Sequence, residues 1–302
     1  MARARAIGAD ALAAKGRWAA FRWLVLRRLS QLSILGLFML GPWAGVWIVT
    51  GNLNSSLTLD TLPLTDPYAL SQVLASGHLP EVSALVGAAI VTAFYFLVGG
   101  RTYCAWVCPV NMVTDAAQWL RERMGIQTAG RLSNRRRFWI LGVTLVLAML
   151  TGNVVWELVN PVSMLHRGLI FGFGLGWTVV LAVFLLDLLV GKRAWCGHLC
   201  PVGAFYSLLG RYSLLRVSAA GRDRCNDCMD CYAVCPELQV IRPALKGAAD
   251  GRGPVILDAQ CTNCGRCIDV CSKDVFRYAL RFGNSSSKPS TKSRTGKTEV
   301  MP

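Results

Sequence analysis

The chain has 302 residues, of which 53% are hydrophobic and 16% are charged, and its mean hydropathy is +0.41. Its formal net charge is +15, from 32 lysines and arginines against 17 aspartates and glutamates. These values exclude a soluble globular, a disordered and a collagen-like chain, and they predict a polytopic α-helical membrane protein. The twelve cysteines do not indicate a secreted disulfide framework, because such frameworks belong to short chains and every cysteine here lies in a patterned run.

The first 28 residues are basic and carry Trp18, Phe21 and Trp23 among arginines. This pattern predicts an amphipathic segment over residues 1–28 on the cytoplasmic surface of the membrane. Two consecutive arginines before an apolar run are also a feature of twin-arginine signals, but the continuation is poor and no small-residue cleavage site follows. An uncleaved anchor is therefore expected.

Four apolar stretches of about 20 residues predict four transmembrane helices. The second is at the short end, but its central run carries no charge, whereas a buried helix of a soluble protein would show a polar stripe. The four stretches are residues 29–49, 79–99, 138–156 and 169–190.

The basic residues predict the orientation of these spans. Counted segment by segment, 7 precede the first span, none lies in the next loop, 7 follow the second span, 1 lies in the third loop (Arg167), and 17 follow the fourth span. An excess of lysine and arginine marks cytoplasmic loops, so both termini are expected inside a bacterial cytoplasmic membrane. Nucleic-acid binding does not explain this charge, because the basic residues flank apolar spans instead of forming one stripe with interleaved aromatics.

An internal repeat links the second and fourth spans. With an offset of 92 residues, segments 98–110 and 190–202 share 7 of 13 positions without a gap, and each contains Cys-x3-Cys-Pro. The chain is therefore expected to contain two tandem two-helix repeats in the same sense across the membrane.

The two Cys-x3-Cys-Pro motifs place four cysteines just inside the predicted cytoplasmic face. Residues four apart share one face of a helix, and the proline marks a break. A four-thiolate metal site, a redox dithiol and small-residue packing all remain open for these cysteines. They are Cys104, Cys108, Cys196 and Cys200.

The region after the fourth span contains Cys-x2-Cys-x2-Cys-x3-Cys twice, which is the spacing of bacterial two-cluster ferredoxins. Three cysteines of each run wrap one [4Fe–4S] cluster, and the fourth reaches the other cluster. Zinc or disulfides would not require two complete runs. The expected ligand sets are Cys225, Cys228, Cys231 and Cys271 for one cluster, and Cys261, Cys264, Cys267 and Cys235 for the other.

The chain is accordingly divided into a transmembrane domain over 29–215, a cytoplasmic α+β ferredoxin-like domain over 216–282 and a disordered tail over 283–302. One departure from the ferredoxin pattern is Ser272, which stands where the second run would normally have proline. The ligands are all present, so this change concerns loop rigidity rather than cluster identity.

Several polar residues are candidates for handling quinol or protons. Asp187 lies inside the fourth span, where carboxylates tend to be functional, although it also lies near Arg193 as a pairing partner. Glu157 and His166 flank an Asn-Pro pair on the predicted outer side. His198, between two cysteines, is a candidate metal ligand, whereas His78 is expected at the interface.

Four spans, two Cys-x3-Cys-Pro motifs and a terminal two-cluster module together resemble the NapH family, the membrane ferredoxin-type subunits of periplasmic nitrate reductase systems. The outer loop 51–67 is also similar to the one typical of that family. It favours that family over relatives with the same cysteine pattern, which are the methylamine-utilisation membrane ferredoxin, the nitrous-oxide-reduction regulator and the copper-oxidase assembly ferredoxins.

The resemblance implies the membrane component of a quinol dehydrogenase. It would take electrons from the quinone pool and pass them, with a periplasmic iron–sulfur partner of the NapG type and with a membrane cytochrome c as a candidate third partner, towards nitrate reductase. A metal-handling factor that reduces copper at the four Cys-x3-Cys-Pro cysteines and a redox-sensing membrane scaffold are the alternatives. The clusters are expected inside and the acceptor outside, and no haem-attachment motif bridges them.

Overall fold

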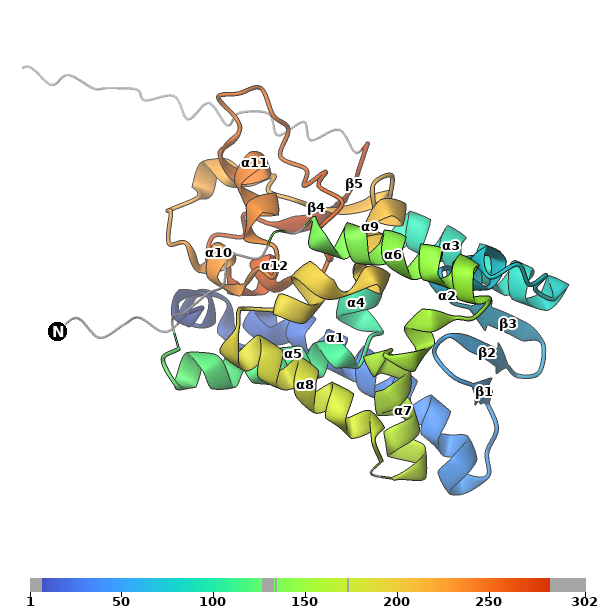
Figure 1. The fold of residues 1–302 in the computed structure, drawn as a ribbon. Helices are drawn as coiled ribbons and strands as arrows, with labels where there is room; N and C mark the ends of the chain where they lie inside the picture. The colour runs from blue at the N-terminus through green and yellow to red at the C-terminus, as the bar shows by residue number, and fades with distance from the viewer. Residues whose placement is uncertain (1–6, 127–132, 134, 173, 283–302) are drawn as a thin grey trace, which may run out of the picture.

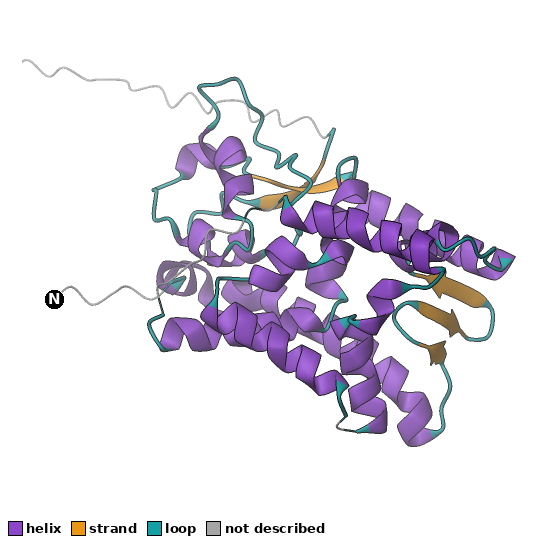
Figure 2. Ribbon diagram, in the orientation of Figure 1, coloured by secondary structure: helices purple, strands orange, loops and turns teal. Residues whose placement is uncertain are grey.

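The computed structural model describes residues 7–126, 133, 135–172 and 174–282. A bundle of helices forms one part, a two-strand module with short helices lies at one end of it, and a three-stranded sheet lies at the opposite end (Figures 1 and 2). The helices are α1 (Ala9–Ala44), α2 (Pro67–Ala75), α3 (Val82–Val98), α4 (Thr102–Trp106), α5 (Val110–Arg123), α6 (Arg136–Thr151), α7 (Pro161–Phe171), α8 (Gly176–Leu189), α9 (Pro201–Gly210), α10 (Asp230–Val234), α11 (Ile241–Lys246) and α12 (Arg266–Val270). The strands are β1 (Val49–Gly51), β2 (Ser55–Thr58), β3 (Leu62–Thr65), β4 (Leu215–Ser218) and β5 (Arg277–Leu280).

Helix α1 joins residues 9–28 of the N-terminal segment to residues 29–44 of the first predicted span, whose last residues lie in the turn before β1 and at its start. It runs for 36 residues, with one non-helical residue at Gly16, and ends where Gly45 adopts a left-handed conformation. In the described part of the chain it is the one helix long and apolar enough to cross a membrane by length and composition.

The other three predicted spans form shorter helices. α3, α6 and α8 have 17, 16 and 14 residues. Glycines set several of these limits, because Gly99 and Gly152 have positive φ angles directly after α3 and α6. The stretch predicted as the fourth span also includes the end of α7, since Gly172 ends that helix with φ 89° before α8 begins.

Large apolar side chains point outward from these helices. On α6, Trp139, Val143, Val146 and Leu150 recur at helical spacing and are 76%, 52%, 49% and 73% exposed. Exposed Phe94 and Leu97 on α3 and similar leucines on α8 continue this pattern. A helix in water would turn such a face inward, so these faces have the character of lipid-facing surface.

The loop after α1 folds back onto the helices. Its strands β1, β2 and β3 form an antiparallel sheet, and Asp66 caps α2 by accepting a hydrogen bond from the Tyr68 amide at 3.3 Å. The Tyr206 hydroxyl, on α9, donates to Asp66 at 2.8 Å. The Tyr68 hydroxyl lies 2.9 Å from the Thr144 hydroxyl of α6. This loop is therefore a packed element of the fold.

The C-terminal module begins and ends with the antiparallel pair β4 and β5. Its two cysteine runs have the same local geometry: the second residue after the first cysteine is left-handed in each run (Asp227 and Asn263), and so is the fourth (Met229 and Gly265). These conformations curl the chain around the space between the cysteines. A small core that includes Val217, Ile241 and Phe276 supports both loops.

The module is fastened to α1. The Asp269 carboxylate accepts hydrogen bonds from the backbone amides of Trp23 and Leu24, and Lys15 donates to the Ile268 carbonyl oxygen. Trp23 also packs edge-on against Tyr278, with ring centroids 4.7 Å apart. The segment before residue 28, which the sequence placed on the membrane surface, thus contacts the module. The predicted tail over 283–302 lies outside the described residues.

Candidate iron–sulfur sites

The first cysteine pocket lies within the module. It is lined by four cysteines together with Tyr232, Leu245 and Phe276. The volume of this open pocket is about 360 Å³. The cysteines are the four that the sequence assigned to one cluster, Cys225, Cys228, Cys231 and Cys271.

The second pocket is lined by the other predicted set, Cys235, Cys261, Cys264 and Cys267, and has about 350 Å³ of space. Burial raises the pKa of Cys261 to about 11. Burial acts in the same direction on Cys264, but Arg266 and Arg27 outweigh it and hold the pKa of that thiol below its usual value. The module therefore offers two separate four-thiol pockets, the second with arginines beside it.

The third pocket joins the two Cys-x3-Cys-Pro motifs. Cys104 lies on α4, Cys196 lies on a π-helical turn (Trp195–Leu199), and Cys108 and Cys200 each precede the proline that leads into the next helix. All four line one pocket of about 420 Å³. Its walls include Trp156 and Trp195, whose rings stack 6.1 Å apart. The structure thus brings together four cysteines that are separated by up to 96 residues.

The twelve cysteines, all within the described ranges, are free thiols. Among the residues that the structure describes, no three His, Cys, Asp or Glu side chains converge closely enough to hold a single metal ion.

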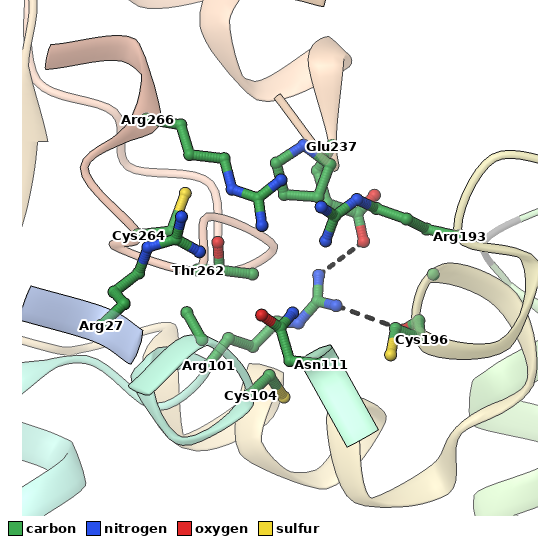
Figure 3. A pocket seen from close by; sticks show the side chains of 13 residues that line it. Arg27, Arg101, Cys104, Asn111, Arg193, Cys196, Glu237, Thr262, Cys264 and Arg266 are labelled. Carbon is green, nitrogen blue, oxygen red and sulfur yellow. Dashed lines mark hydrogen bonds and ion pairs between the residues drawn. The ribbon is translucent and has the colours of Figure 1, made fainter. Parts of the chain in front are cut away.

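A cavity rich in arginine separates the second and third pockets (Figure 3). Cys264 borders it on the module side, and Cys104 and Cys196 border it on the side of the helical bundle. Four arginines reach it from α1, from the two repeated segments and from α12. They are Arg27, Arg101, Arg193 and Arg266.

Arg101 contacts both sides of this cavity. One guanidinium nitrogen, Nη1, donates to the Glu237 carboxylate at 2.5 Å and to the Gln260 carbonyl oxygen at 2.9 Å. The other, Nη2, donates to the Cys196 carbonyl oxygen at 3.3 Å. Arg137 also pairs with Glu237, at 3.2 Å. Burial raises the pKa of Glu237, but the two arginines more than offset this and the carboxyl stays ionised.

Asp115, on α5, holds two of the other cavity arginines, Arg193 and Arg266, in place. Its carboxylate pairs with Arg266 at 2.6 Å and also with Arg28 and Arg193. Burial raises its pKa, but the three cations outweigh that effect and hold the pKa well below the usual range. Positive charge around the cavity therefore exceeds negative charge.

The proposed quinol and proton residues lie in different places. Asp187 accepts a hydrogen bond from the Trp195 amide at 2.9 Å, and its other oxygen is buried with no partner in the described part of the chain. Glu157 accepts from the Asn160 side chain at 3.1 Å. Since Trp195 and Asn160 line the third pocket, both carboxylates lie directly behind its wall.

The histidines are not gathered at a site. His166 packs against Phe38 of α1, with ring centroids 5.3 Å apart. Burial and Arg167 lower its pKa. His198 lies between the motif cysteines in sequence, but in space its charged neighbours are Glu237 and Arg137. His78 is exposed beside Ser76.

Sequence reasoning did not single out Arg101, Asp115 or Glu237. It named Arg193 only as a pairing partner for Asp187, whereas in the structure Arg193 forms its ion pair with Asp115. A signal was present for the two arginines, because they occupy the same position of the 92-residue repeat. Glu237 follows the Cys-Pro pair of the first ferredoxin run directly. No local pattern indicated that this carboxylate would meet an arginine 136 residues earlier in the chain.

Comparison with known families agrees with this arrangement. A model described as a 4Fe-4S dicluster domain matches residues 224–275, which contain both ferredoxin runs. A second model, described as a 4Fe-4S binding domain, matches residues 81–127 and 170–219, which contain both Cys-x3-Cys-Pro motifs. No solved structure matches the chain.

Three relatives cover nearly the whole chain. The ferredoxin-type protein NapH of Escherichia coli is 50% identical over 94% of this chain and 98% of that protein. NapH of Haemophilus influenzae is 48% identical over 89% of this chain and 94% of that protein. The methylamine utilization ferredoxin-type protein MauN of Paracoccus denitrificans is 55% identical over 90% of this chain and 95% of that protein.

Fold, cysteine pockets and similarity together define a membrane-anchored iron–sulfur electron-transfer protein. The chain belongs to the NapH family of ferredoxin-type proteins. Its identity to MauN proteins is as high as its identity to NapH proteins, so overall similarity does not assign the chain to one of these two kinds of protein.

Proposed function

We propose that this chain is the membrane component of a quinol dehydrogenase, passing electrons from the quinone pool to an iron–sulfur partner of the NapG type outside the membrane. The observation that carries the proposal is the placement of two four-thiol pockets in a module bound to helices with outward apolar faces. Such a protein joins a lipid-soluble donor to one-electron carriers and needs no substrate chemistry of its own.

The ligand assignment follows the two pockets. Cys225, Cys228, Cys231 and Cys271 hold one [4Fe–4S] cluster. Cys235, Cys261, Cys264 and Cys267 hold the other. In each set the fourth ligand comes from the opposite cysteine run, which ties the two loops together.

The orientation rests on charge and on the apolar helix faces. One basic residue in the outer loops against 31 elsewhere supports a four-span protein with both termini and the module on the cytoplasmic side. The shorter helices α3, α6 and α8 cross with the help of the flanking loops, and their exposed leucines, valines and aromatics face lipid. The sheet β1–β3 and α2 then lie on the outer side.

Quinol oxidation must release two electrons and two protons for each quinone formed. The two electrons leave one at a time, because each [4Fe–4S] cluster exchanges a single electron. We assign proton acceptance to Asp187, whose unpaired buried oxygen lies behind Trp195, with Glu157 as the outlet on the outer side. His166 is a weaker candidate because it lies apart from the pocket walls, against Phe38.

We take the acceptor system to be the periplasmic nitrate reductase, because the outer loop 51–67 is similar to the one typical of the NapH family. A test uses cells that lack their own NapH protein and depend on quinol-linked nitrate reduction. The wild-type chain should restore nitrate reduction, and Cys228→Ala should not. If the chain restored methylamine oxidation and not nitrate reduction, we would assign it to the MauN system. Restoration of neither activity would contradict the proposed function.

A further inference from the structure

The two cysteine runs of the module have the same spacing but lie in different surroundings. The loop of the first run is open to solvent: Met229 is 56% exposed, and Asp227 pairs with Lys246 on the surface. The loop of the second run is covered by the rest of the chain. Gly265 occupies the position that corresponds to Met229, and a Cβ atom there would lie 2.6 Å from the ring of Trp23 on α1. Glycine is therefore required for α1 to cover this loop.

Hydrogen bonds also hold the second loop against the helical bundle. The indole nitrogen of Trp106, on α4, donates to the Asn263 carbonyl oxygen at 3.1 Å. The Asn263 side chain donates to the carbonyl oxygen of Val98, the last residue of α3, at 3.0 Å. In the first loop, the residue that corresponds to Asn263 is the exposed Asp227. The second cysteine site is thus the one that borders the bundle.

Arg27 of α1 brings a positive charge to the second loop. Its side chain is 1% exposed and lines the arginine cavity together with Cys264. Figure 3 shows its guanidinium turned towards that cysteine. Its Nε and Nη1 atoms are buried and have no hydrogen-bond partner in the described part of the chain. A buried cation is costly without a negative charge nearby, so a negatively charged group beside Cys264 would offset this cost.

Arg266 adds a second cation to the same site. It stands between Cys264 and Cys267 in the sequence and lines both the arginine cavity and the second pocket. It pairs with Asp115, but that carboxylate is shared with two more arginines. Positive charge therefore remains at the second site, whereas the first pocket is lined by Asp227 and by apolar residues besides its cysteines.

We propose that the two ferredoxin sites are unequal, and that Arg27 and Arg266 give the second site the higher reduction potential. The inference rests on the proposed function, because it takes the two [4Fe–4S] clusters and their ligands from it. An electron that enters the module then stays at the second site, next to the helical bundle. The first cluster is reduced only after the second already holds an electron.

Charge and burial act on this potential in opposite directions. A cubane with four thiolates carries net negative charge, and reduction adds one more, which the exclusion of water disfavours. Cations beside the cluster favour reduction, and the exclusion of water strengthens their attraction. Glu237 also lines the second pocket, but it is paired with both Arg101 and Arg137. We therefore expect the effect of the cations to outweigh that of burial.

This order of potentials protects the electrons of the module from side reactions. The first loop is exposed, so soluble oxidants reach it more easily than the covered second loop. Because the first cluster has the lower potential, it stays oxidised while the module holds a single electron. The two electrons of one quinol are then taken up in two one-electron steps, the second site first.

The first test is a redox titration of the full-length chain, kept anaerobic in detergent, with dithionite as the reductant and electron paramagnetic resonance as the readout. The wild-type protein should show two clusters with different potentials. Cys228→Ala removes a ligand of the first site, and the signal that remains should titrate at the higher of the two potentials. A remaining signal at the lower potential, or two equal potentials in the wild-type protein, would overturn the inference. No arginine variant has to fold for this result.

The second test concerns Arg27, which we treat as a positioning residue. In Arg27→Gln, the ratio of reduced to oxidised second cluster at a fixed potential should fall about tenfold, which is about 59 mV for one electron. Arg27→Lys keeps the charge and should recover most of this ratio. Arg22→Gln is the matched control, because Arg22 lies exposed on the same helix and water and salt screen its charge. No shift in Arg27→Gln, or an equal shift in the control, would show that Arg27 does not set the potential.

The outcomes separate this inference from the proposed function. A reversed order of potentials would overturn the inference, and the proposed function would stand if quinol still reduced the clusters. Conversely, clusters that dithionite reduces in the expected order but that quinol leaves oxidised would contradict the proposed function and leave the inference standing.

Discussion

Arg101 and Glu237 form an ion pair, 2.5 Å between nitrogen and oxygen, that joins the turn after α3 to the ferredoxin module. Both side chains are almost fully buried, and Arg137 of α6 completes the cluster at 3.2 Å. Because the carboxylate follows the Cys235-Pro236 pair, the position of Cys235, a proposed cluster ligand, is tied directly to Arg101 and to Arg137 of α6. This small polar cluster sets the distance between the module and the third pocket.

Glu237→Gln should therefore destabilise the protein strongly. It leaves the buried cations Arg101 and Arg137 without their carboxylate, and breaking such a pair costs about 3–5 kcal/mol. The measurement is denaturant unfolding in detergent micelles. Glu122→Gln is the matched control, because Glu122 meets Lys192 at 3.9 Å on the exposed surface and should cost less than about 1 kcal/mol. Equal losses in the two variants would contradict the structural role of Glu237.

Cys228→Ala should remove one ferredoxin cluster and keep the other. The second pocket has its own four cysteines, so its spectroscopic signal should persist while iron content falls by about four atoms. Ser272→Ala, next to Cys271, is the control that changes a neighbour without removing a ligand. Loss of both clusters in the control, or of neither in Cys228→Ala, would refute the ligand sets.

The orientation predicts the behaviour of fusion proteins. Alkaline phosphatase is active only outside the cytoplasm. A fusion after Gly77, in the exposed turn between α2 and α3, should be active, and one after Gly283 should be inactive. The reverse pattern would place the ferredoxin module outside the cytoplasm and would contradict the proposed orientation.

The burial of the Asp66 carboxyl predicts that the stability of the folded protein depends on pH. Burial raises its pKa from 3.8 to about 6, although Tyr206 and the Tyr68 amide donate to it. Because the folded-state pKa is the higher one, the stabilisation is fully present below about pH 4 and is lost as the pH rises through about 6. Above that pH the buried charge costs about 3 kcal/mol.

Thermal unfolding in detergent at pH 5 and pH 8 tests this effect. The wild-type protein should unfold at a lower temperature at pH 8, and Asp66→Asn should narrow the difference, since the amide oxygen still accepts both hydrogen bonds without charge. Asp60→Asn, in the exposed turn between β2 and β3, should keep the wild-type difference. An Asp66→Asn variant with the full wild-type difference would show that another group is responsible.

The cysteine chemistry was readable from the sequence because its determinants are local. The x2-x2-x3 spacing fixes how each run curls, and the structure places each set of four cysteines around its own pocket, while their role as cluster ligands stays a prediction. The convergence of Cys104 and Cys108 with Cys196 and Cys200 could be anticipated only through the repeat, since nothing local relates residues so far apart.

The parts that sequence reasoning missed depend on long-range packing. Trp18, Phe21 and Trp23 among arginines suggested a helix lying on the membrane, yet the Asp269 carboxylate bonds the same helix to the module. Loop 51–67 was expected as an outer connection, and the sequence did not indicate that Asp66 and Tyr206 pack it onto the helices. Both outcomes depend on contacts with side chains distant in the sequence, and periodicity contains no information about such contacts.

The central claim is that quinol gives its electrons to the clusters of this chain. The most direct measurement adds quinol to anaerobic membranes that contain the oxidised wild-type protein and records electron paramagnetic resonance spectra as electrons arrive. We expect the signals of reduced [4Fe–4S] clusters to appear on quinol addition, to be absent in membranes without the chain, and to diminish in Cys228→Ala. Clusters that dithionite reduces fully but that quinol leaves oxidised, even with the external iron–sulfur partner present, would contradict the account.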